Sequence, residues 1–190
     1  MSNKLLSDLF HSNTYTSDKD RLGYVDNFYN NFLKKYKETP ITMMEIGVET
    51  GGSLKLWKDY FHEKSEIYGA DIDFGYYNHV FGVFTVIGDM YSLEKSSLFP
   101  DKFFDLIIDD GPHTLESFVL LMMRYFSKLK DGGSLIIEDI IVSSWVEPLV
   151  ELSARLGYSS CEVIDMTGKQ KTQELLNLWQ NGLYILNLTK

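Results

Sequence analysis

The chain has 190 residues, of which 44% are hydrophobic and 14% aromatic. This composition is enough for one packed domain and excludes a disordered chain. No apolar run approaches the roughly 18 residues that span a bilayer. Lys and Arg number 18 against 27 Asp and Glu, a net charge of −9. We therefore expect neither nucleic acid nor an anionic membrane as a partner.

The amino terminus and the cysteine usage favour a cytoplasmic location. Residues 1–20 turn polar too early for the apolar core of a signal peptide. Cys161 is the only cysteine, so no internal disulfide forms and a reducing compartment fits. Its apolar neighbours favour a buried structural thiol over a nucleophile.

Residues 1–38 have helical character. Leu22, Val25, Phe28 and Phe32 recur at spacings of three and four, which is typical of one face of a helix. We find no linker and no internal repeat, so this region and residues 39–190 are expected to form a single domain.

In residues 39–190, short apolar runs alternate with amphipathic stretches. This alternation predicts an α/β fold, a mostly parallel sheet with helices on both faces. The expected strands are 41–46, 66–71, 83–87, 104–109, 134–138, 161–166 and 183–188. The expected helices are 52–62, 115–129, 145–156 and 172–180. The motif LKDGG is expected to end the second of these helices.

Ligands of an open parallel sheet bind beyond the C-terminal ends of its strands. An acidic residue stands at each of the first five predicted strand ends, most of them beside glycine. Seven acids are expected to share this edge: Asp71, Asp73, Asp89, Asp109, Asp110, Glu138 and Asp139. Because like charges repel, something cationic is expected among them.

The first three strand ends suit a nucleoside cofactor. Gly47 permits a tight turn and a close approach of the backbone to a ligand. Asp71 can accept hydrogen bonds from two ribose hydroxyls, and Asp89 can accept one from an adenine amino group. The spacing from Gly47 to Gly51 matches neither the dinucleotide motif nor the Walker A loop, which disfavours NAD and ATP. For the glycines alone, a turn that needs a positive φ is an equally good interpretation.

The next two strand ends suit a metal. Neighbouring strands would place Asp110 opposite Glu138 and Asp139. Three carboxylates can share a hard divalent cation such as Mg²⁺. His113 follows on the same edge, where a neutral imidazole can act as a general base.

Two structural alternatives remain open at this site. Asp109 or Asp110 is a candidate N-cap of the helix that begins near Thr114. Glu138 and Asp139 can equally be a solvated strand end. The joint occurrence of these acids with a histidine favours the functional interpretation.

Five motifs together resemble the class I S-adenosylmethionine-dependent methyltransferases: EIGVETGG, YGADID, GDM, FDLIIDDG and LKDGGSLIIED. The resemblance implies that family's Rossmann-like seven-stranded sheet, in which the last two strands form an antiparallel hairpin. Within this class, IDDGPH followed by IIED resembles the macrocin and mycinamicin metal-dependent sugar O-methyltransferases. That resemblance implies Asp110, Glu138 and Asp139 as Mg²⁺ ligands and His113 as the base.

The resemblance implies S-adenosylmethionine as the cofactor, with Asp71 at its ribose and Gly47 against it. The residues that we assign to the cofactor lie at the first four strand ends: Glu45, Gly47, Gly51, Asp71, Asp73, Asp89 and Asp109. The enzymes of this family are substantially longer than this chain, so their macrolide substrate is not transferred to it.

The predicted function is Mg²⁺-dependent methylation of a hydroxyl on a sugar or another small-molecule diol. One alternative is a metal-independent methyltransferase that acts on a small molecule or a protein. The other is a non-catalytic cofactor-binding domain with the same fold. The expected partner is a small-molecule acceptor, and a homo-oligomer is compatible with the sequence.

Overall fold

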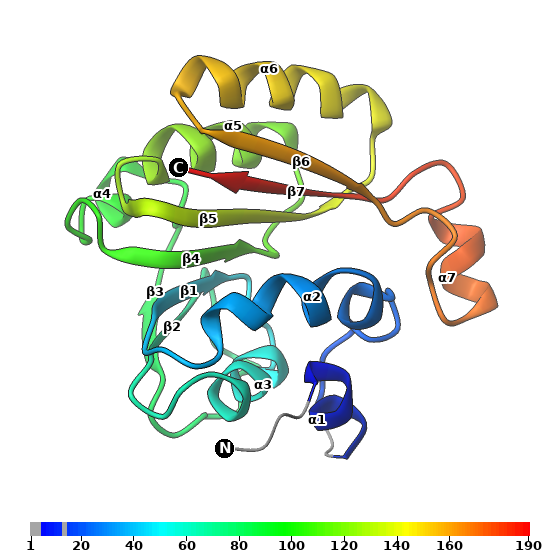
Figure 1. The fold of residues 1–190 in the computed structure, drawn as a ribbon, viewed down its shortest axis with the longest axis horizontal. Helices are drawn as coiled ribbons and strands as arrows, with labels where there is room; N and C mark the ends of the chain where they lie inside the picture. The colour runs from blue at the N-terminus through cyan, green and yellow to red at the C-terminus, as the bar shows by residue number, and fades with distance from the viewer. Residues whose placement is uncertain (1–4, 13–14) are drawn as a thin grey trace.

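In the computed structural model, which describes residues 5–12 and 15–190, a seven-stranded sheet lies between layers of helices (Figure 1). The strands are β1 (Thr42–Ile46), β2 (Glu66–Asp71), β3 (Phe84–Ile87), β4 (Phe104–Asp109), β5 (Leu129–Ile140), β6 (Ser160–Asp165) and β7 (Tyr184–Thr189). Their spatial order is β3-β2-β1-β4-β5-β7-β6. The pairs of β7 with β5 and β6 are antiparallel and the others are parallel. This confirms the predicted sheet and its antiparallel final pair.

Helices cover both faces of the sheet (Figure 1). One layer contains α4 (Leu93–Ser96), α5 (Leu115–Tyr125), the 3-10 turn η3 (Ser143–Trp145) and α6 (Val146–Leu156). The other contains α1 (Leu6–Ser12), α3 (Gly52–Tyr60) and a continuous helical segment between them. That segment is π-helical over η1 (Val25–Tyr29), α-helical over α2 (Asn30–Phe32) and 3-10 over η2 (Leu33–Tyr36). The short α7 (Gln173–Leu178) lies beside the end of the sheet.

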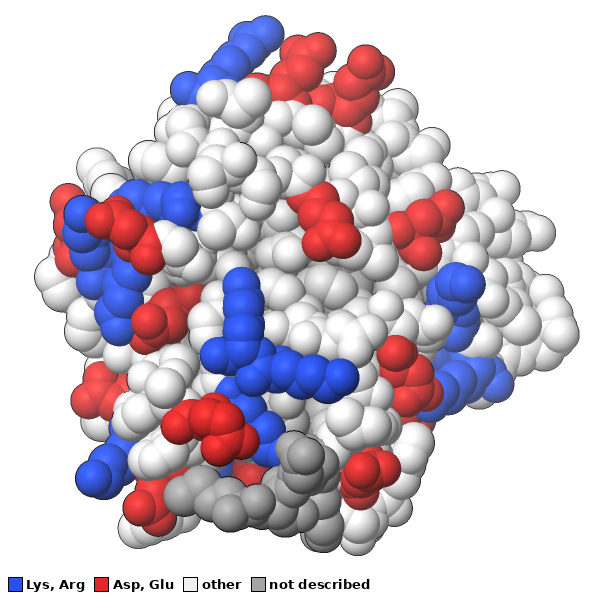
Figure 2. All heavy atoms as spheres, in the orientation of Figure 1, with Lys and Arg blue, Asp and Glu red and all other residues white. Residues whose placement is uncertain are grey.

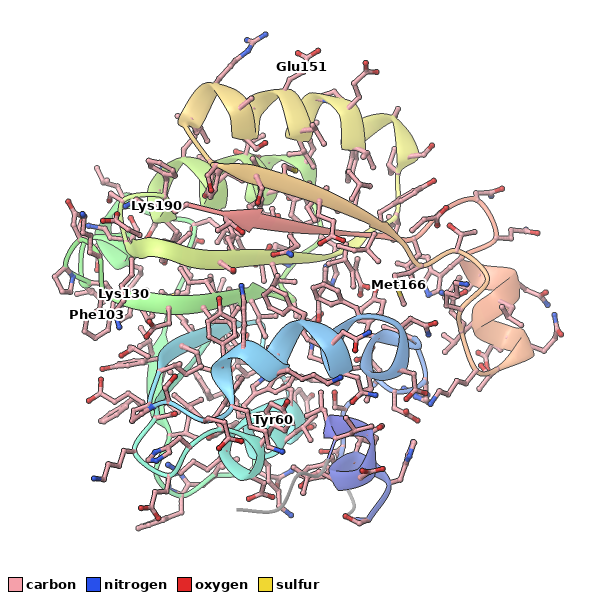
Figure 3. All side chains as sticks on the ribbon, viewed as in Figure 1. Tyr60, Phe103, Lys130, Glu151, Met166 and Lys190 are labelled. Carbon is pink, nitrogen blue, oxygen red and sulfur yellow. The ribbon has the colours of Figure 1, made fainter. Side chains whose placement is uncertain are left out.

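The central strands are buried on both faces, because alternate side chains enter two different apolar cores. In β1, Met43 packs into the core under α3 and Met44 into the core under α5. In β5, Ile136 packs into the core under α3 and Ile137 into the core under α5. Side chains fill both layers in Figure 3, whereas Glu151 on α6 points away from the sheet. This packing fixes the strand ends from which the site is built.

Residues 15–18 are irregular and residues 19–23 form turns, so this part of the region predicted to be helical, residues 1–38, is not helical. The chain enters a left-handed conformation at Gly23, where φ is 81° and glycine is favoured. These turns carry Lys19 into the interior, where it is 0% exposed. Residues 6–12 and 24–36 of this region are helical, as predicted, and residues 1–4 and 13–14 lie outside the described residues.

The motif LKDGG does not end a helix, as had been expected from its glycines. α5 ends at Tyr125 and β5 begins at Leu129, so the motif lies within the strand. The pairing of β4 with β5 shifts by several residues there, because residues 130–133 bulge out of the ladder. Gly132 accommodates this bulge with a φ of 79°.

The surface carries charges of both signs. On the face shown in Figure 2, Lys and Arg lie among Asp and Glu and form no continuous basic surface. Within residues 5–12 and 15–190, no helix is both long enough and apolar enough to cross a membrane.

Candidate functional site

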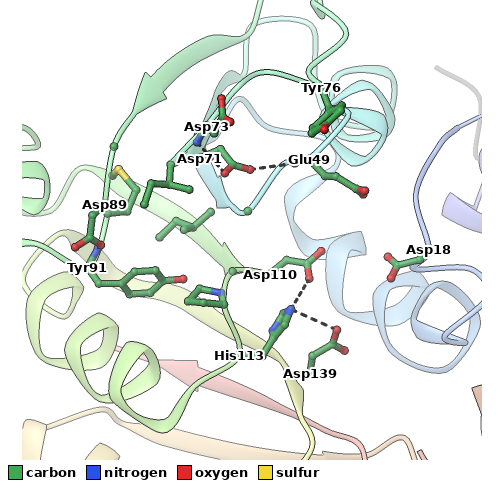
Figure 4. Close-up of a pocket in the computed structure, with 17 residues that line it drawn as sticks. Asp18, Glu49, Asp71, Asp73, Tyr76, Asp89, Tyr91, Asp110, His113 and Asp139 are labelled. Atoms are coloured by element: carbon green, nitrogen blue, oxygen red, sulfur yellow. Dashed lines mark hydrogen bonds and ion pairs between the residues drawn. The ribbon is translucent and has the colours of Figure 1, made fainter. Parts of the chain in front are cut away.

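A cavity of about 650 Å³ opens beyond the C-terminal ends of the central strands, a size typical of small-molecule sites. Its acidic lining consists of Asp18, Glu49, Asp71, Asp73, Asp89, Asp110 and Asp139 (Figure 4). The other lining residues are Ile46, Gly47, Ile72, Tyr76, Gly88, Met90, Tyr91, Gly111, Pro112 and His113. Among the residues that the structure describes, no Lys or Arg lines this cavity. The cavity therefore suits a ligand that is neutral or carries positive charge.

Asp71 faces the cavity and also holds the loop that follows β1. Its Oδ2 accepts hydrogen bonds from the backbone N–H groups of Val48 and Glu49 at 2.9 and 3.1 Å. Its Oδ1 accepts one from Asp73 N–H at 3.3 Å. The acid at the end of β2 thus fixes the glycine turn at the cavity wall.

Gly47 lies where the ends of β1 and β4 approach most closely. Its φ is 83°, and a Cβ atom there would lie 2.0 Å from the carbonyl oxygen of Asp110. The backbone N–H of Asp110 in turn donates to the carbonyl of Ile46 at 2.8 Å. Only glycine fits this position, so the turn and the contact with Asp110 account for Gly47, and its approach to a ligand stays a prediction.

Of the seven residues predicted for the cofactor, four line the cavity: Gly47, Asp71, Asp73 and Asp89. The structure places Glu45, Gly51 and Asp109 outside the lining. Glu45 is fully buried, and its Oε2 accepts hydrogen bonds from Ser53 Oγ at 2.7 Å and Trp57 Nε1 at 3.0 Å. A Cβ atom on Gly51 would meet the ring of Tyr77, at 2.6 Å.

Asp109 lies beneath the cavity and is fully buried. The hydroxyl of Tyr91 donates to its Oδ1, while its Oδ2 has no hydrogen-bond partner among the described residues. Burial raises the pKa of Asp109 to about 7, because the charged form loses its hydration. The structure therefore gives Asp109 a supporting position below Tyr91.

Asp110, His113 and Asp139 meet at one end of the cavity (Figure 4). His113 Nε2 lies 3.7 Å from Asp110 Oδ1 and 3.7 Å from Asp139 Oδ2. The ligand atoms of all three residues lie within 4.8 Å of one another. Two carboxylates and an imidazole at this spacing fit a divalent cation, which carboxylate oxygens bind well.

Two residues of this cluster have unusual backbone conformations. His113 and Asp139 adopt positive φ values of 51° and 55°, which are uncommon outside glycine and are concentrated at functional sites. Burial and the nearby Asp110 raise the pKa of Asp139 to about 6.

Glu138, predicted to share the metal, is turned away from this cluster. It is 1% exposed, and its two oxygens accept hydrogen bonds from the ammonium of Lys19 and the hydroxyl of Tyr29. Asp139 lines the cavity and Glu138 does not, so the two neighbours on β5 have different surroundings.

Lys19 is the functional-site residue that the sequence analysis missed. Besides Glu138, its Nζ lies 2.7 Å from Asp110 Oδ2 and 3.4 Å from Glu45 Oε1. Burial lowers the pKa of Lys19, but the surrounding carboxylates together raise it well above its ordinary value. The excess of acids at one sheet edge is the sequence signal for such a cation, although it does not say which residue supplies it.

The alternatives for these acids are not supported. Thr114 is the N-cap of α5: its Oγ1 accepts from Ser117 N–H at 3.1 Å, so neither Asp109 nor Asp110 caps the helix. Glu138 and Asp139 are not a solvated strand end, because their side chains are 1% and 13% exposed.

No model of a known protein family matches the chain. Among curated proteins, it is 29% identical over 126 residues to a demethylmacrocin O-methyltransferase of Streptomyces fradiae, which covers 62% of this chain and 32% of that protein. It is 30% identical over 126 residues to an 8-demethyl-8-alpha-L-rhamnosyl tetracenomycin-C 2'-O-methyltransferase of Streptomyces olivaceus, covering 62% and 33%. The chain thus spans about a third of the length of these relatives.

Several solved structures have the same fold. The MycE methyltransferase of the mycinamycin pathway, in complex with Mg and SAH, superposes with a TM-score of 0.65 at 19% identity, over 87% of this chain and 48% of that one. A MycE complex that also holds mycinamycin VI matches at 27% identity, with a TM-score of 0.55, over 65% and 34%. A SAM-dependent methyltransferase from Archaeoglobus fulgidus matches with a TM-score of 0.62 at 17% identity, over 91% and 97%.

The fold is that of the class I S-adenosylmethionine-dependent methyltransferases. Within this class, the chain resembles the sugar O-methyltransferases of the macrocin and mycinamicin type, as the motifs predicted.

Proposed function

We propose that the chain catalyses the Mg²⁺-dependent transfer of a methyl group from S-adenosylmethionine to a hydroxyl of a sugar or another small-molecule diol. The observation that carries this proposal is the convergence of Asp110, His113 and Asp139 in a cavity that Gly47 and Asp71 also line. The relatives that support it are O-methyltransferases, two of them named for a rhamnosyl sugar. A cytoplasmic location fits this proposal.

S-adenosylmethionine supplies the methyl group when it is bound. In this proposal Gly47 lets the backbone approach the cofactor, and Asp71 and Asp73 accept hydrogen bonds from ribose hydroxyls. Asp89, which follows β3, accepts one from the adenine amino group. What supports these roles is that all four residues line the cavity. The acidic lining favours the positively charged sulfonium form of the cofactor.

Asp110 and Asp139 are the residues that would hold Mg²⁺, with His113 beside them. Bound Mg²⁺ orients hydroxyl oxygens and lowers their pKa. His113 acts as the general base: its Nε2 accepts the hydroxyl proton, and the two carboxylates 3.7 Å away stabilise the imidazolium. Glu138 remains below the site, bound to Lys19, so the proposed ligand set is narrower than the one predicted from sequence.

The test is methyl transfer from labelled S-adenosylmethionine to a panel of glycosides, with Mg²⁺ or with EDTA. We expect activity that EDTA abolishes and added Mg²⁺ restores. His113→Ala is expected to lower kcat by about 10²- to 10⁴-fold while leaving the affinity for S-adenosylhomocysteine unchanged. His62→Ala, a change at the end of α3, is the matched control and should retain the rate.

A metal-independent methyltransferase is the second candidate, and Lys19 favours it. Its ammonium already neutralises part of the acidic cluster without a metal. If the wild-type chain kept full activity in EDTA and His113→Ala lost activity, the metal-independent candidate would replace the first. A full rate in His113→Ala would contradict both.

A further inference from the structure

The two carboxylates that face His113 share a pattern: each uses one oxygen inside the protein and presents the other to the cavity. Asp110 Oδ2 accepts a hydrogen bond from Lys19 Nζ at 2.7 Å, while its Oδ1 lies 3.7 Å from His113 Nε2. Asp139 Oδ1 accepts one from the Tyr24 hydroxyl, while its Oδ2 lies 3.7 Å from the same nitrogen. Each inner partner thus fixes which oxygen of its carboxylate faces outward.

The inner partners come from one anchored segment. Lys19 and Tyr24 are both 0% exposed; Lys19 lies in the turns before η1, and Tyr24 directly precedes η1. Lys171, in the loop after β6, pairs with Asp20 and lies 2.8 Å from Asp26. Its backbone N–H donates to the carbonyl of residue 21 at 2.8 Å. The segment that carries Lys19 and Tyr24 is therefore held by two sets of contacts: those of Lys171 on one side, and those with Asp110 and Asp139 on the other.

We infer that Lys19 and Tyr24 are positioning residues for a divalent cation, because they orient the free oxygens of Asp110 and Asp139 toward one point beside His113. This inference rests on the proposed function, in which those two carboxylates hold Mg²⁺. Groups that orient metal ligands from behind typically contribute 10- to 100-fold to metal affinity. A carboxylate held in its binding orientation also loses less rotational freedom when the metal binds.

Tyr29 provides a matched control. Like Tyr24, it lies in the segment before β1, is 0% exposed and donates its hydroxyl to a carboxylate of β5. Its partner is Glu138, which faces away from the cavity. Removing either hydroxyl costs one buried hydrogen bond to an acid, but only the Tyr24 hydroxyl acts on a carboxylate that faces the cavity.

The experiment is a titration with Mn²⁺, a spectroscopic substitute for Mg²⁺, followed by electron paramagnetic resonance without cofactor or acceptor. The samples are the wild-type chain, Tyr24→Phe, Tyr29→Phe and Asp139→Asn. We expect Tyr24→Phe to weaken Mn²⁺ binding about tenfold or more and Tyr29→Phe to change it less than about twofold. Asp139→Asn should weaken it at least as much as Tyr24→Phe. Affinity for S-adenosylhomocysteine, measured in parallel, should be unchanged in both tyrosine variants and so report that they are folded.

The outcomes separate this inference from the function on which it rests. If wild type binds Mn²⁺ and Asp139→Asn does not, but Tyr24→Phe binds as wild type does, only the positioning role is overturned. Equal losses of Mn²⁺ affinity in the two tyrosine variants also overturn the positioning role, because they would indicate that either change loosens the whole segment. If the wild-type chain binds no Mn²⁺, or if Asp139→Asn binds Mn²⁺ as tightly as wild type does, both this inference and the proposed function are overturned.

Discussion

Lys19 places one buried positive charge among the carboxylates of Glu45, Asp110 and Glu138. Removing one partner of a buried ion pair leaves charge that neither water nor protein compensates. We therefore expect Lys19→Met to lower the free energy of unfolding by about 3–5 kcal/mol, measured by urea denaturation at neutral pH. Lys171→Met is the control, because Lys171 pairs with Asp20 and Asp26 near the surface and should cost about 0–1 kcal/mol. If the two variants lost similar amounts of unfolding free energy, the buried ion pairs of Lys19 would not be central to stability.

The acids of the site could be predicted from the sequence better than the residues that bind them. Asp110 and His113 follow β4 and Asp139 lies near the end of β5, so the sheet brings them together at one edge wherever the strands are correctly placed. Lys19 is 91 residues from Asp110 and Tyr24 is 115 from Asp139, and no periodic pattern marks either one. Such long-range pairings depend on how an irregular segment is folded, which local sequence patterns do not determine.

At the scale of elements, the contact between the ends of β1 and β4 depends on Gly47. A methyl group there would meet the carbonyl of Asp110 and would also be strained by the positive φ. Gly132, in the bulge of β5, has a similar φ of 79°, but nothing lies within 4 Å of a Cβ atom built on it. Gly132→Ala thus measures the backbone strain alone, at about 1–2 kcal/mol.

We expect Gly47→Ala to cost clearly more than Gly132→Ala in urea denaturation. We also expect it to weaken S-adenosylhomocysteine binding in calorimetry, because the end of β4 must move away from the turn. Gly132→Ala should leave that binding unchanged. If the two variants lose equal stability and bind equally well, the close contact at Gly47 is not important for the site.

The elements were predicted best where the hydrophobic pattern was strong. β2 and β4 have the expected bounds, and β1, β3, β6 and β7 differ from them by one residue. β5 is longer than expected because Gly132 and Gly133 are absorbed in a bulge, which a sequence pattern does not distinguish from a helix stop. The course of residues 15–23 escaped prediction because a buried lysine, and not apolar spacing, determines it.

At the scale of the whole molecule, the net charge of −9 is partly concentrated in the cavity. Some of the acids at the sheet edge are buried beneath it: Glu138 is paired with Lys19, and burial raises the pKa of Asp109. Those that line the cavity, such as Asp18 and Glu49, remain available to act on an entering ligand. The charge of the lining therefore favours ligands that are neutral or positively charged.

This charge predicts a preference among acceptors, given the proposed function. A neutral glycoside and its uronate, which differ only in one carboxylate, form a matched pair. We expect kcat/KM for the uronate to be about tenfold lower or more at an ionic strength near 0.01 M, because the acidic lining repels it. The gap should narrow near 0.15 M, where the Debye length falls from about 30 Å to about 8 Å. A uronate methylated as fast as its neutral counterpart at low salt would show that the acceptor enters by a route that these carboxylates do not control.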